Sequence, residues 1–84
     1  MKKLFLVGAW EDYLYWQATD KSTLKKINAL LREIERIPYE GSGKPEPLKY
    51  QLTDWWSRRI NLEQRLVYRV EENTLIVLQC RYHY

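Results

Sequence analysis

Apolar and polar side chains recur along the first part of the chain with the spacing of one strand and one helix. Residues 3–7 form a short apolar run, which predicts a first strand. Four side chains then follow at the spacing of a single helical face, and we expect a first helix to bury that face. They are Trp10, Tyr13, Leu14 and Gln17.

A second helix is predicted to begin after Asp20, whose side chain can cap a helix N-terminus. Apolar side chains then recur at i, i+3 and i+4 steps, while charged residues occupy the other side. We expect the helix to end before Pro38, because proline disfavours helical geometry in the residue that precedes it. Its apolar face consists of Leu24, Ile27, Leu31 and Ile34, with Leu30 beside them.

Residues 38–47 are predicted to form a loop, because all three prolines of the chain and two of its three glycines lie there. Pro45 and Pro47 flank Glu46 and restrict its backbone to extended geometry. This arrangement is a way to hold one carboxylate in a fixed place.

The second half of the chain is predicted to form strands joined by short turns. Connections this short make neighbouring strands antiparallel. A strand, two helices and then an antiparallel meander predict one α+β domain over residues 1–84, with a single sheet and both helices on one face. The four predicted strands span residues 48–52, 55–60, 65–70 and 74–80.

Composition narrows the classes of function. The chain has 14 Lys and Arg against 11 Asp and Glu, and a net charge of +3 is only weak evidence for an anionic partner. One cysteine excludes an intrachain disulfide, and no pair of Cys or His residues has metal-ligand spacing, so we expect no metal and no cofactor. With no secretory signal and no membrane span in evidence, a cytoplasmic protein is expected.

Cleavage of RNA without a metal needs a base, a cation that stabilises the charged phosphorus, and an acid for the leaving oxygen. The single histidine, His83, titrates near neutral pH without much tuning, and Glu46 offers a carboxylate. Each feature also has a plainer interpretation. A histidine near a terminus is usually solvated, a glutamate in a polar loop is usually a surface charge, and Arg58 and Arg59 are typical edge charges that block aggregation.

Six short motifs nevertheless stand in order along the whole chain: residues 12–17 (DYLYWQ), 19–21 (TDK), 43–49 (GKPEPLK), 56–60 (WSRRI), 65–68 (RLVY) and 80–84 (CRYHY). Their order and spacing resemble those of the YoeB toxins of bacterial toxin–antitoxin modules, a branch of the RelE/ParE group. The resemblance implies a RelE-like microbial ribonuclease fold. It also implies a ribosome-dependent endoribonuclease that cuts messenger RNA in the A site of the 70S ribosome and so inhibits translation.

The resemblance assigns catalytic roles to four residues. Glu46 matches the general base of the family and His83 its general acid. Arg65 matches the residue that stabilises the phosphate in the transition state, and Tyr84 matches a residue that assists there. These assignments agree with the chemical demand for a base, a cation and an acid.

Further cations are expected to bind the RNA. Lys49 and Arg59 match family residues that orient the RNA, and Arg81 stands beside the expected acid. The resemblance also implies a YefM-like antitoxin and a homodimer as partners. Spare aromatic residues such as Trp10, Tyr15 and Trp16 are candidates for the dimer contact, although at least half of them are expected to be ordinary core residues.

Two other functions stay open. A ParE-like inhibitor of DNA gyrase would need no catalytic residues of its own, and the set of Glu46, Arg65 and His83 speaks against it. A non-catalytic module that binds RNA or a protein partner would use the same cations without cutting. Whether Arg59 and Arg65 share one face of the sheet depends on a hairpin register that the sequence leaves undetermined.

Overall fold

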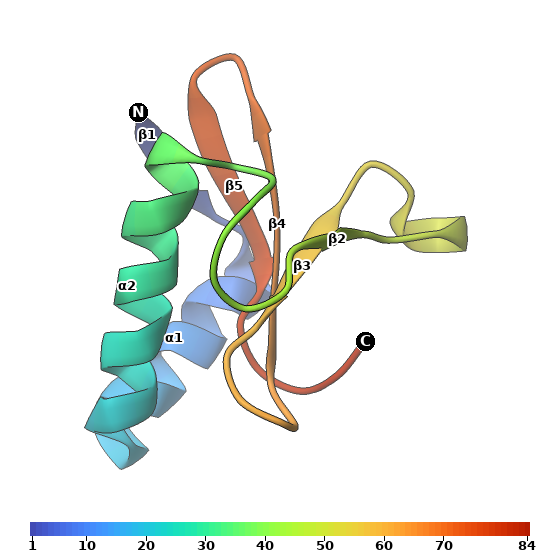
Figure 1. Ribbon diagram of the computed structural model, residues 1–84. Coiled ribbons are helices and arrows are strands. Elements are labelled where there is room, and N and C mark those ends of the chain that lie inside the picture. The colour runs from blue at the N-terminus through green and yellow to red at the C-terminus, as the bar shows by residue number, and fades with distance from the viewer.

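Five strands form one sheet in the computed structural model, which describes residues 1–84 (Figure 1). The strand order across the sheet is β1-β5-β4-β3-β2. The elements are β1 (Lys2–Phe5), α1 (Val7–Thr19), α2 (Lys21–Arg36), β2 (Glu46–Pro47), the 3-10 helix η1 (Tyr50–Leu52), β3 (Trp56–Arg59), β4 (Arg65–Glu71) and β5 (Thr74–Gln79).

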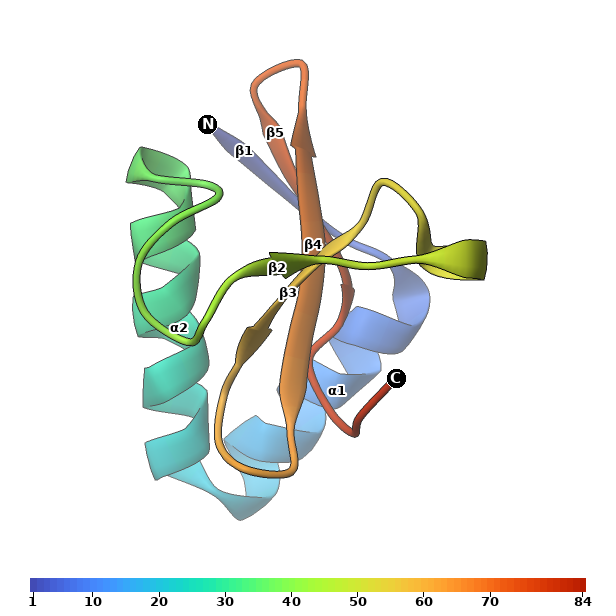
Figure 2. The same ribbon diagram turned by 45° about the vertical axis from the view of Figure 1, so that its right-hand side comes forward.

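The predicted α+β class is confirmed, and the sheet is mixed. Strands β2 to β5 pair antiparallel, as the short turns between them require. Strand β1 pairs parallel with β5, since the chain returns to the sheet only after passing through both helices. The helices pack on one face of the sheet, and the core between them includes Ile27, Ile34, Leu66 and Leu75 (Figures 1 and 2).

Helix α2 follows the predicted pattern. Asp20 caps it, because its Oδ1 atom accepts hydrogen bonds from the backbone N–H groups of Ser22 and Thr23, each at 3.1 Å. These two bonds satisfy donors that have no partner inside the helix. Four of the five apolar side chains expected on the inner face are buried, namely Ile27, Leu30, Leu31 and Ile34.

The buried face of α1 differs from the predicted one. Ala9 and Trp16 are buried, whereas Trp10 and Leu14 are 49% and 41% exposed. The helix carries apolar side chains on two sides, so their spacing does not identify the inner side. Trp16 suits the inner side because its indole N–H donates a 2.8 Å hydrogen bond to the carbonyl of Cys80.

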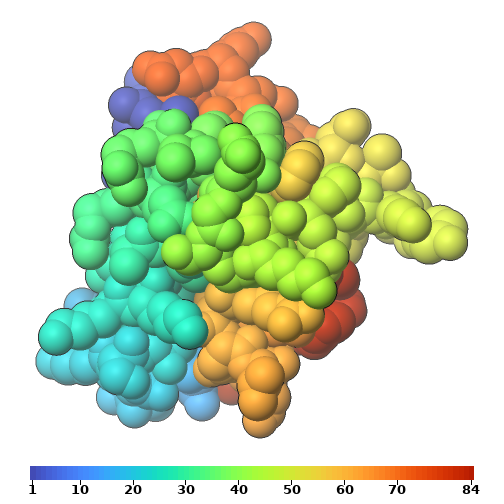
Figure 3. Space-filling model, in the orientation of Figure 1, coloured from blue at the N-terminus to red at the C-terminus, as the bar shows by residue number.

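The predicted strand over residues 48–52 is wrong. The strand in this region is the pair Glu46–Pro47, and the chain then turns through the short helix Tyr50–Leu52. Tyr50 and Asp54 have φ values of 58° and 78°, left-handed geometry that breaks an extended run. The segment between β2 and β3 therefore projects from the body of the molecule (Figures 1 and 3).

The register of the sheet determines which side chains share the open face, opposite the helices. Glu46 pairs with Ser57 across β2 and β3, and Ser57 pairs with Val67 of β4. Arg59 pairs directly with Arg65. Since paired residues point to the same side of a sheet, the two arginines share the face of Glu46 and Ser57. This register answers the question that the sequence left open.

Candidate active site

A hydrogen-bonded cluster joins the C-terminal segment to the open face of the sheet. The Tyr84 hydroxyl lies 3.2 Å from Oε1 of Glu46 and donates a hydrogen bond to it. The same hydroxyl lies 3.1 Å from the Oγ atom of Ser57, whose residue is only 1% exposed. Figure 3 shows the C-terminal residues, in red, against the segment around β2 and the β3–β4 hairpin. Two residues expected to be catalytic, far apart in sequence, are thus in direct contact.

A hollow of about 310 Å³ opens beside this cluster. It brings Lys49 next to Glu46 and Tyr84, as expected for a cation that helps to hold an anionic ligand. Its lining consists of Glu46, Pro47, Leu48, Lys49, Tyr50, Leu52 and Tyr84. The hollow is open to solvent and has aromatic side chains on its wall, which suits a nucleotide base.

Arg65 and Arg59 form a pair of like charges on the open face. The Nη1 atom of Arg65 donates to three carbonyls of the β3–β4 loop, those of Asn61, Leu62 and Gln64, at 2.9 to 3.3 Å. These bonds fix the guanidinium and leave its Nε and Nη2 atoms without a partner in the protein. Like charges placed directly opposite one another repel, and a phosphate bound between them would relieve that repulsion.

His83 is exposed and lies against Tyr84. Its Nδ1 atom is 3.0 Å from the main-chain oxygen of Tyr84, and the two rings are 4.8 Å apart between centroids. This contact engages Nδ1 and leaves Nε2 as the ring nitrogen that can face a ligand. This geometry is suited to a residue that donates a proton.

Arg81 is engaged elsewhere. Its guanidinium carbon lies 3.4 Å from the ring centroid of Tyr15, on α1, and 4.5 Å from that of Tyr82. The contacts of the Arg81 guanidinium with both rings attach the C-terminal segment to the first helix. The expected contact between Arg81 and RNA therefore stays a prediction, and the structure gives this side chain another role.

The interpretation of Arg58 as an edge charge is wrong. The residue is 0% exposed and forms an ion pair with Glu33. Its guanidinium also donates to the Tyr68 hydroxyl at 3.2 Å and to the carbonyls of Ile37 at 2.6 Å, Glu40 at 2.5 Å and Ser42 at 3.2 Å. Arg58 thereby organises the loop that leads to Glu46.

Glu33 is held ionised by that loop. Its carboxylate accepts hydrogen bonds from the backbone N–H and the hydroxyl of Ser42, and these, with Arg58, lower the pKa of Glu33 below its usual 4.5. Gly41 allows the close approach: its φ is +108°, and a Cβ there would lie 2.2 Å from Oε1 of Glu33. Neither Ser57 nor this support of the loop was anticipated, since both depend on contacts between residues distant in sequence.

The chemistry of the chain's other reactive groups is limited. Burial raises the pKa of the Cys80 thiol to about 12, so it is not a thiolate nucleophile. No group of three or more His, Cys, Asp and Glu side chains is placed to bind a metal ion. Neither helix is both long and apolar enough to cross a membrane.

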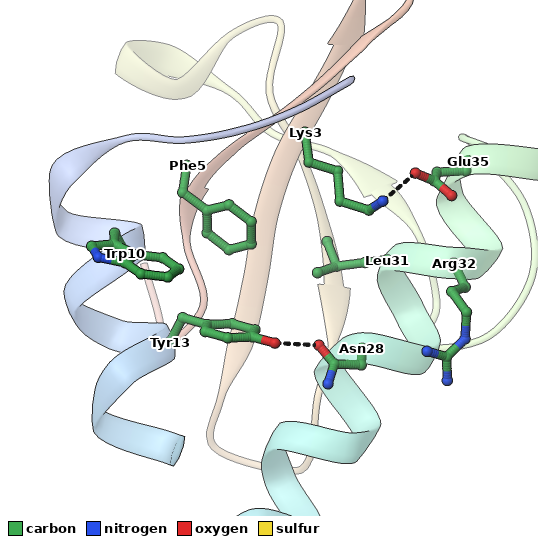
Figure 4. A pocket seen from close by; sticks show the side chains of 8 residues that line it. All are labelled: Lys3, Phe5, Trp10, Tyr13, Asn28, Leu31, Arg32 and Glu35. Atoms are coloured by element: carbon green, nitrogen blue, oxygen red, sulfur yellow. Dashed lines mark hydrogen bonds and ion pairs between the residues drawn. The ribbon is translucent and has the colours of Figure 1, made fainter. Parts of the chain in front are cut away.

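The largest hollow of the molecule, about 640 Å³, lies away from the candidate site, between β1, α1 and α2 (Figure 4). Phe5, Trp10 and Tyr13 form one wall, and an ion pair of 2.6 Å between Lys3 and Glu35 closes one end. It contains none of the residues expected to act on RNA, so volume alone does not identify the site.

Comparison with known proteins gives a consistent result. A family model described as the YoeB-like toxin of bacterial type II toxin–antitoxin system matches residues 5–84. The chain is 55% identical to the toxin YoeB of Escherichia coli (strain K12) over the whole of both chains. A YoeB/ParE toxin from Agrobacterium tumefaciens is 49% identical, covers 100% of both chains and superposes with a TM-score of 0.97. YoeB of Staphylococcus aureus, solved in a heterotetrameric complex with YefM and as a dimer, is 50% identical in both structures, with TM-scores of 0.93 and 0.94 over 100% of this chain and 98% of that one.

Proposed function

The chain belongs to the YoeB-like toxins of bacterial type II toxin–antitoxin systems, and we propose that it is an endoribonuclease that cuts messenger RNA in the A site of the 70S ribosome. Cleavage needs no metal ion and inhibits translation. The observation that carries this proposal is the direct contact of Tyr84 with Glu46 on the face that also presents the Arg59–Arg65 pair. A carboxylate held in place beside two cations offers a base and a site for the charged phosphate, two of the three things that metal-free phosphodiester cleavage requires.

In the proposed reaction the RNA's own 2′-hydroxyl is the nucleophile. Glu46 accepts its proton, the 2′-oxygen forms a bond to phosphorus, and the bond from phosphorus to the 5′-oxygen breaks. Arg65, with Nε and Nη2 free, stabilises the added negative charge on the phosphate. His83 gives a proton to the departing 5′-oxygen. The products are a 2′,3′-cyclic phosphate and a 5′-hydroxyl.

The remaining site residues are proposed to bind the RNA. Lys49 lies in the hollow beside Glu46 and Tyr84, where its ammonium can contact a neighbouring phosphate. Arg59, exposed beside Arg65, can contact another. The ring of Tyr84 can stack on a base, since RNA recognition commonly uses aromatic side chains in this way.

We further propose a YefM-like antitoxin and a second copy of the chain as partners, in the cytoplasm. The S. aureus relative has been solved with YefM and as a dimer. The outward side of α1 supports a contact between copies, because Val7, Trp10 and Leu14 are exposed along it. Exposed apolar side chains at helical spacing are typical of a helix that packs against a partner.

The test is cleavage of a defined message by the purified protein, with and without translating ribosomes, with the new RNA ends mapped. Site-specific cleavage that requires ribosomes, and is lost in Glu46→Ala, is the expected result. Glu40→Ala is the matched control, since it removes a carboxylate from the same loop without touching the cluster. Inhibition of DNA gyrase without RNA cleavage would support a ParE-like function instead. Ribosome or RNA binding without new ends would indicate a non-catalytic module.

A further inference from the structure

The C-terminal segment is tied to the body of the protein before it reaches the candidate site. The backbone N–H of Cys80 donates to Oδ2 of Asp12 at 3.1 Å, and the Cys80 carbonyl accepts the 2.8 Å bond from the Trp16 indole. Asp12 and Trp16 lie one turn apart on α1, so a single helix face holds both polar groups of Cys80. The Gln79 side chain then donates to the carbonyl of Arg81 at 3.0 Å.

Tyr82 is held in the same manner by the β3–β4 hairpin. Its backbone N–H donates to the side-chain oxygen Oε1 of Gln64, and its carbonyl accepts a 3.0 Å hydrogen bond from the backbone N–H of Arg65. Two consecutive residues of the hairpin thus form hydrogen bonds with both main-chain polar groups of Tyr82. Of these two hydrogen bonds, only that of Gln64 involves a side chain and can be removed by substitution.

These hydrogen bonds to Tyr82 stabilise a backbone conformation that is otherwise unfavourable. Tyr82 has a φ of +69°, in the left-handed region that residues with a side chain seldom occupy. Such a conformation persists where surrounding contacts impose it. The turn at Tyr82 sends the next two residues back toward the sheet, where the Tyr84 hydroxyl meets Glu46 and Ser57.

We propose that Gln64 is a positioning residue for His83 and Tyr84. Its amide oxygen stabilises the left-handed turn at Tyr82 and so fixes the two residues that follow it. Gln64 directly precedes Arg65, the proposed cation of the site. The same end of the hairpin therefore positions both that cation and residues 82–84, the C-terminal tail, which contains the proposed acid His83. The inference rests on the proposed function, since it assigns Gln64 a part in that reaction.

Three variants test the proposal by kinetics on ribosome-bound message. Gln64→Ala removes the acceptor, and kcat is expected to fall by about 10- to 100-fold, the usual cost of a misplaced catalytic group. Gln64→Glu keeps an oxygen in the same place and is expected to restore most of kcat, with a higher KM because the added charge repels RNA. Leu62→Ala is the control from the same loop, because Leu62 is 88% exposed and the alanine keeps the main-chain carbonyl that Arg65 contacts; it leaves kcat unchanged. All three are expected to unfold at nearly the wild-type temperature.

Backbone NMR relaxation of residues 82–84, measured without RNA, provides a readout that does not depend on activity. The steady-state {1H}–15N nuclear Overhauser effect of these residues is expected to drop in Gln64→Ala and to match the wild type in Gln64→Glu and Leu62→Ala. A tail as rigid in Gln64→Ala as in the wild type overturns the proposal, and so does a loosened tail with unchanged kcat. If the wild type itself cuts no RNA, the proposed function fails, while the relaxation data still decide whether Gln64 holds the tail.

Discussion

The Tyr84 hydroxyl donates a hydrogen bond of 3.2 Å to Oε1 of Glu46, although the two residues are 38 positions apart in the sequence. Glu46 belongs to the edge strand β2, whereas Tyr84 ends the segment that follows β5. The hydroxyl binds one oxygen of the carboxylate and leaves Oε2 for the 2′-hydroxyl of a bound RNA. Tyr84 therefore keeps the carboxylate oriented toward the place where the proposed nucleophile binds, with Ser57 as its second partner.

The first prediction follows from that contact. Tyr84→Phe keeps the ring and removes the hydroxyl, so the single-turnover rate of cleavage is expected to fall by about tenfold, the equivalent of roughly 1.4 kcal/mol for one lost hydrogen bond. The melting temperature is expected to change little, because the contact lies at the surface. A wild-type rate in this variant would remove the hydroxyl from the mechanism and leave only a stacking role for the ring.

The second prediction concerns the proposed acid. His83→Gln retains a polar side chain of similar reach but cannot deliver a proton, so cleavage is expected to fall by about 10²- to 10⁴-fold. Binding to ribosomes, measured by co-sedimentation, should persist because Lys49, Arg59 and Arg65, which are proposed to bind the RNA, are unchanged. Loss of binding in step with loss of cleavage would point to a general defect in folding, and full activity would mean that another group supplies the proton.

Local patterns in the sequence were sufficient for one helix and for the order of the elements. Asp20 and the apolar spacing after it describe α2 correctly, because capping and amphipathicity act within one element. For α1 the apolar spacing predicts the wrong buried face, since Trp10 and Trp16 are both large and apolar and only tertiary contacts, such as that of Trp16 with Cys80, distinguish them. Its inner face is a property of the tertiary structure.

The same distinction separates Arg58 from Arg59. They are adjacent and chemically identical, yet alternation along β3 sends one into the core and the other to the open face. Strand alternation predicts that they differ, but only the pairing with β4 shows which one is buried. The hydrogen bond from Tyr82 to Gln64 cannot be predicted from local patterns either, since it depends on a left-handed turn at Tyr82 that no local signal marks.

The third prediction uses that pair of arginines. Arg58→Ala leaves Glu33 and several loop carbonyls without their partner, and the free energy of unfolding is expected to fall by about 3 kcal/mol or more. Arg59→Ala removes an exposed side chain and is expected to alter stability by less than about 0.5 kcal/mol while weakening RNA binding. Urea denaturation and an RNA-binding titration check the two effects. Equal stability of the two variants would contradict the structural role given to Arg58.

The fourth prediction concerns acid stability. The pKa of Glu33 is lowered in the folded protein, chiefly by the hydrogen bond from the Ser42 backbone N–H, so the folded state binds a proton there less readily than the unfolded chain. This carboxylate therefore stabilises the fold fully above its unfolded pKa, near 4.5. The contribution is lost as the pH falls through the lower, folded pKa.

Glu33→Gln removes that titration. The variant is expected to be less stable than the wild type at neutral pH, with a difference that shrinks as the pH falls below 4.5. Urea denaturation at a series of pH values measures it, and Glu40→Gln, in the exposed part of the loop, serves as the control. A difference between variant and wild type that stays constant across this range would exclude ionisation of Glu33 as the source of the stability.

The last prediction concerns the cleavage chemistry itself. A carboxylate is a far weaker base than the alkoxide that it must help to form from the 2′-hydroxyl, while cations such as Lys49 would stabilise the charged phosphate. Fixed positioning must supply part of the difference, and it can contribute about 7–11 kcal/mol in favourable cases.

A mechanism of this kind uses the RNA's own 2′-hydroxyl, so a message with one 2′-deoxy sugar at the cleavage position should bind and resist cutting. The fragments from an ordinary message should end in a 2′,3′-cyclic or 3′-phosphate and a 5′-hydroxyl, and EDTA should leave the chemical step unchanged while ribosomes stay intact. Cleavage of the deoxy substrate at the normal rate, or fragments with 5′-phosphates, would show that water or a metal-bound hydroxide attacks instead.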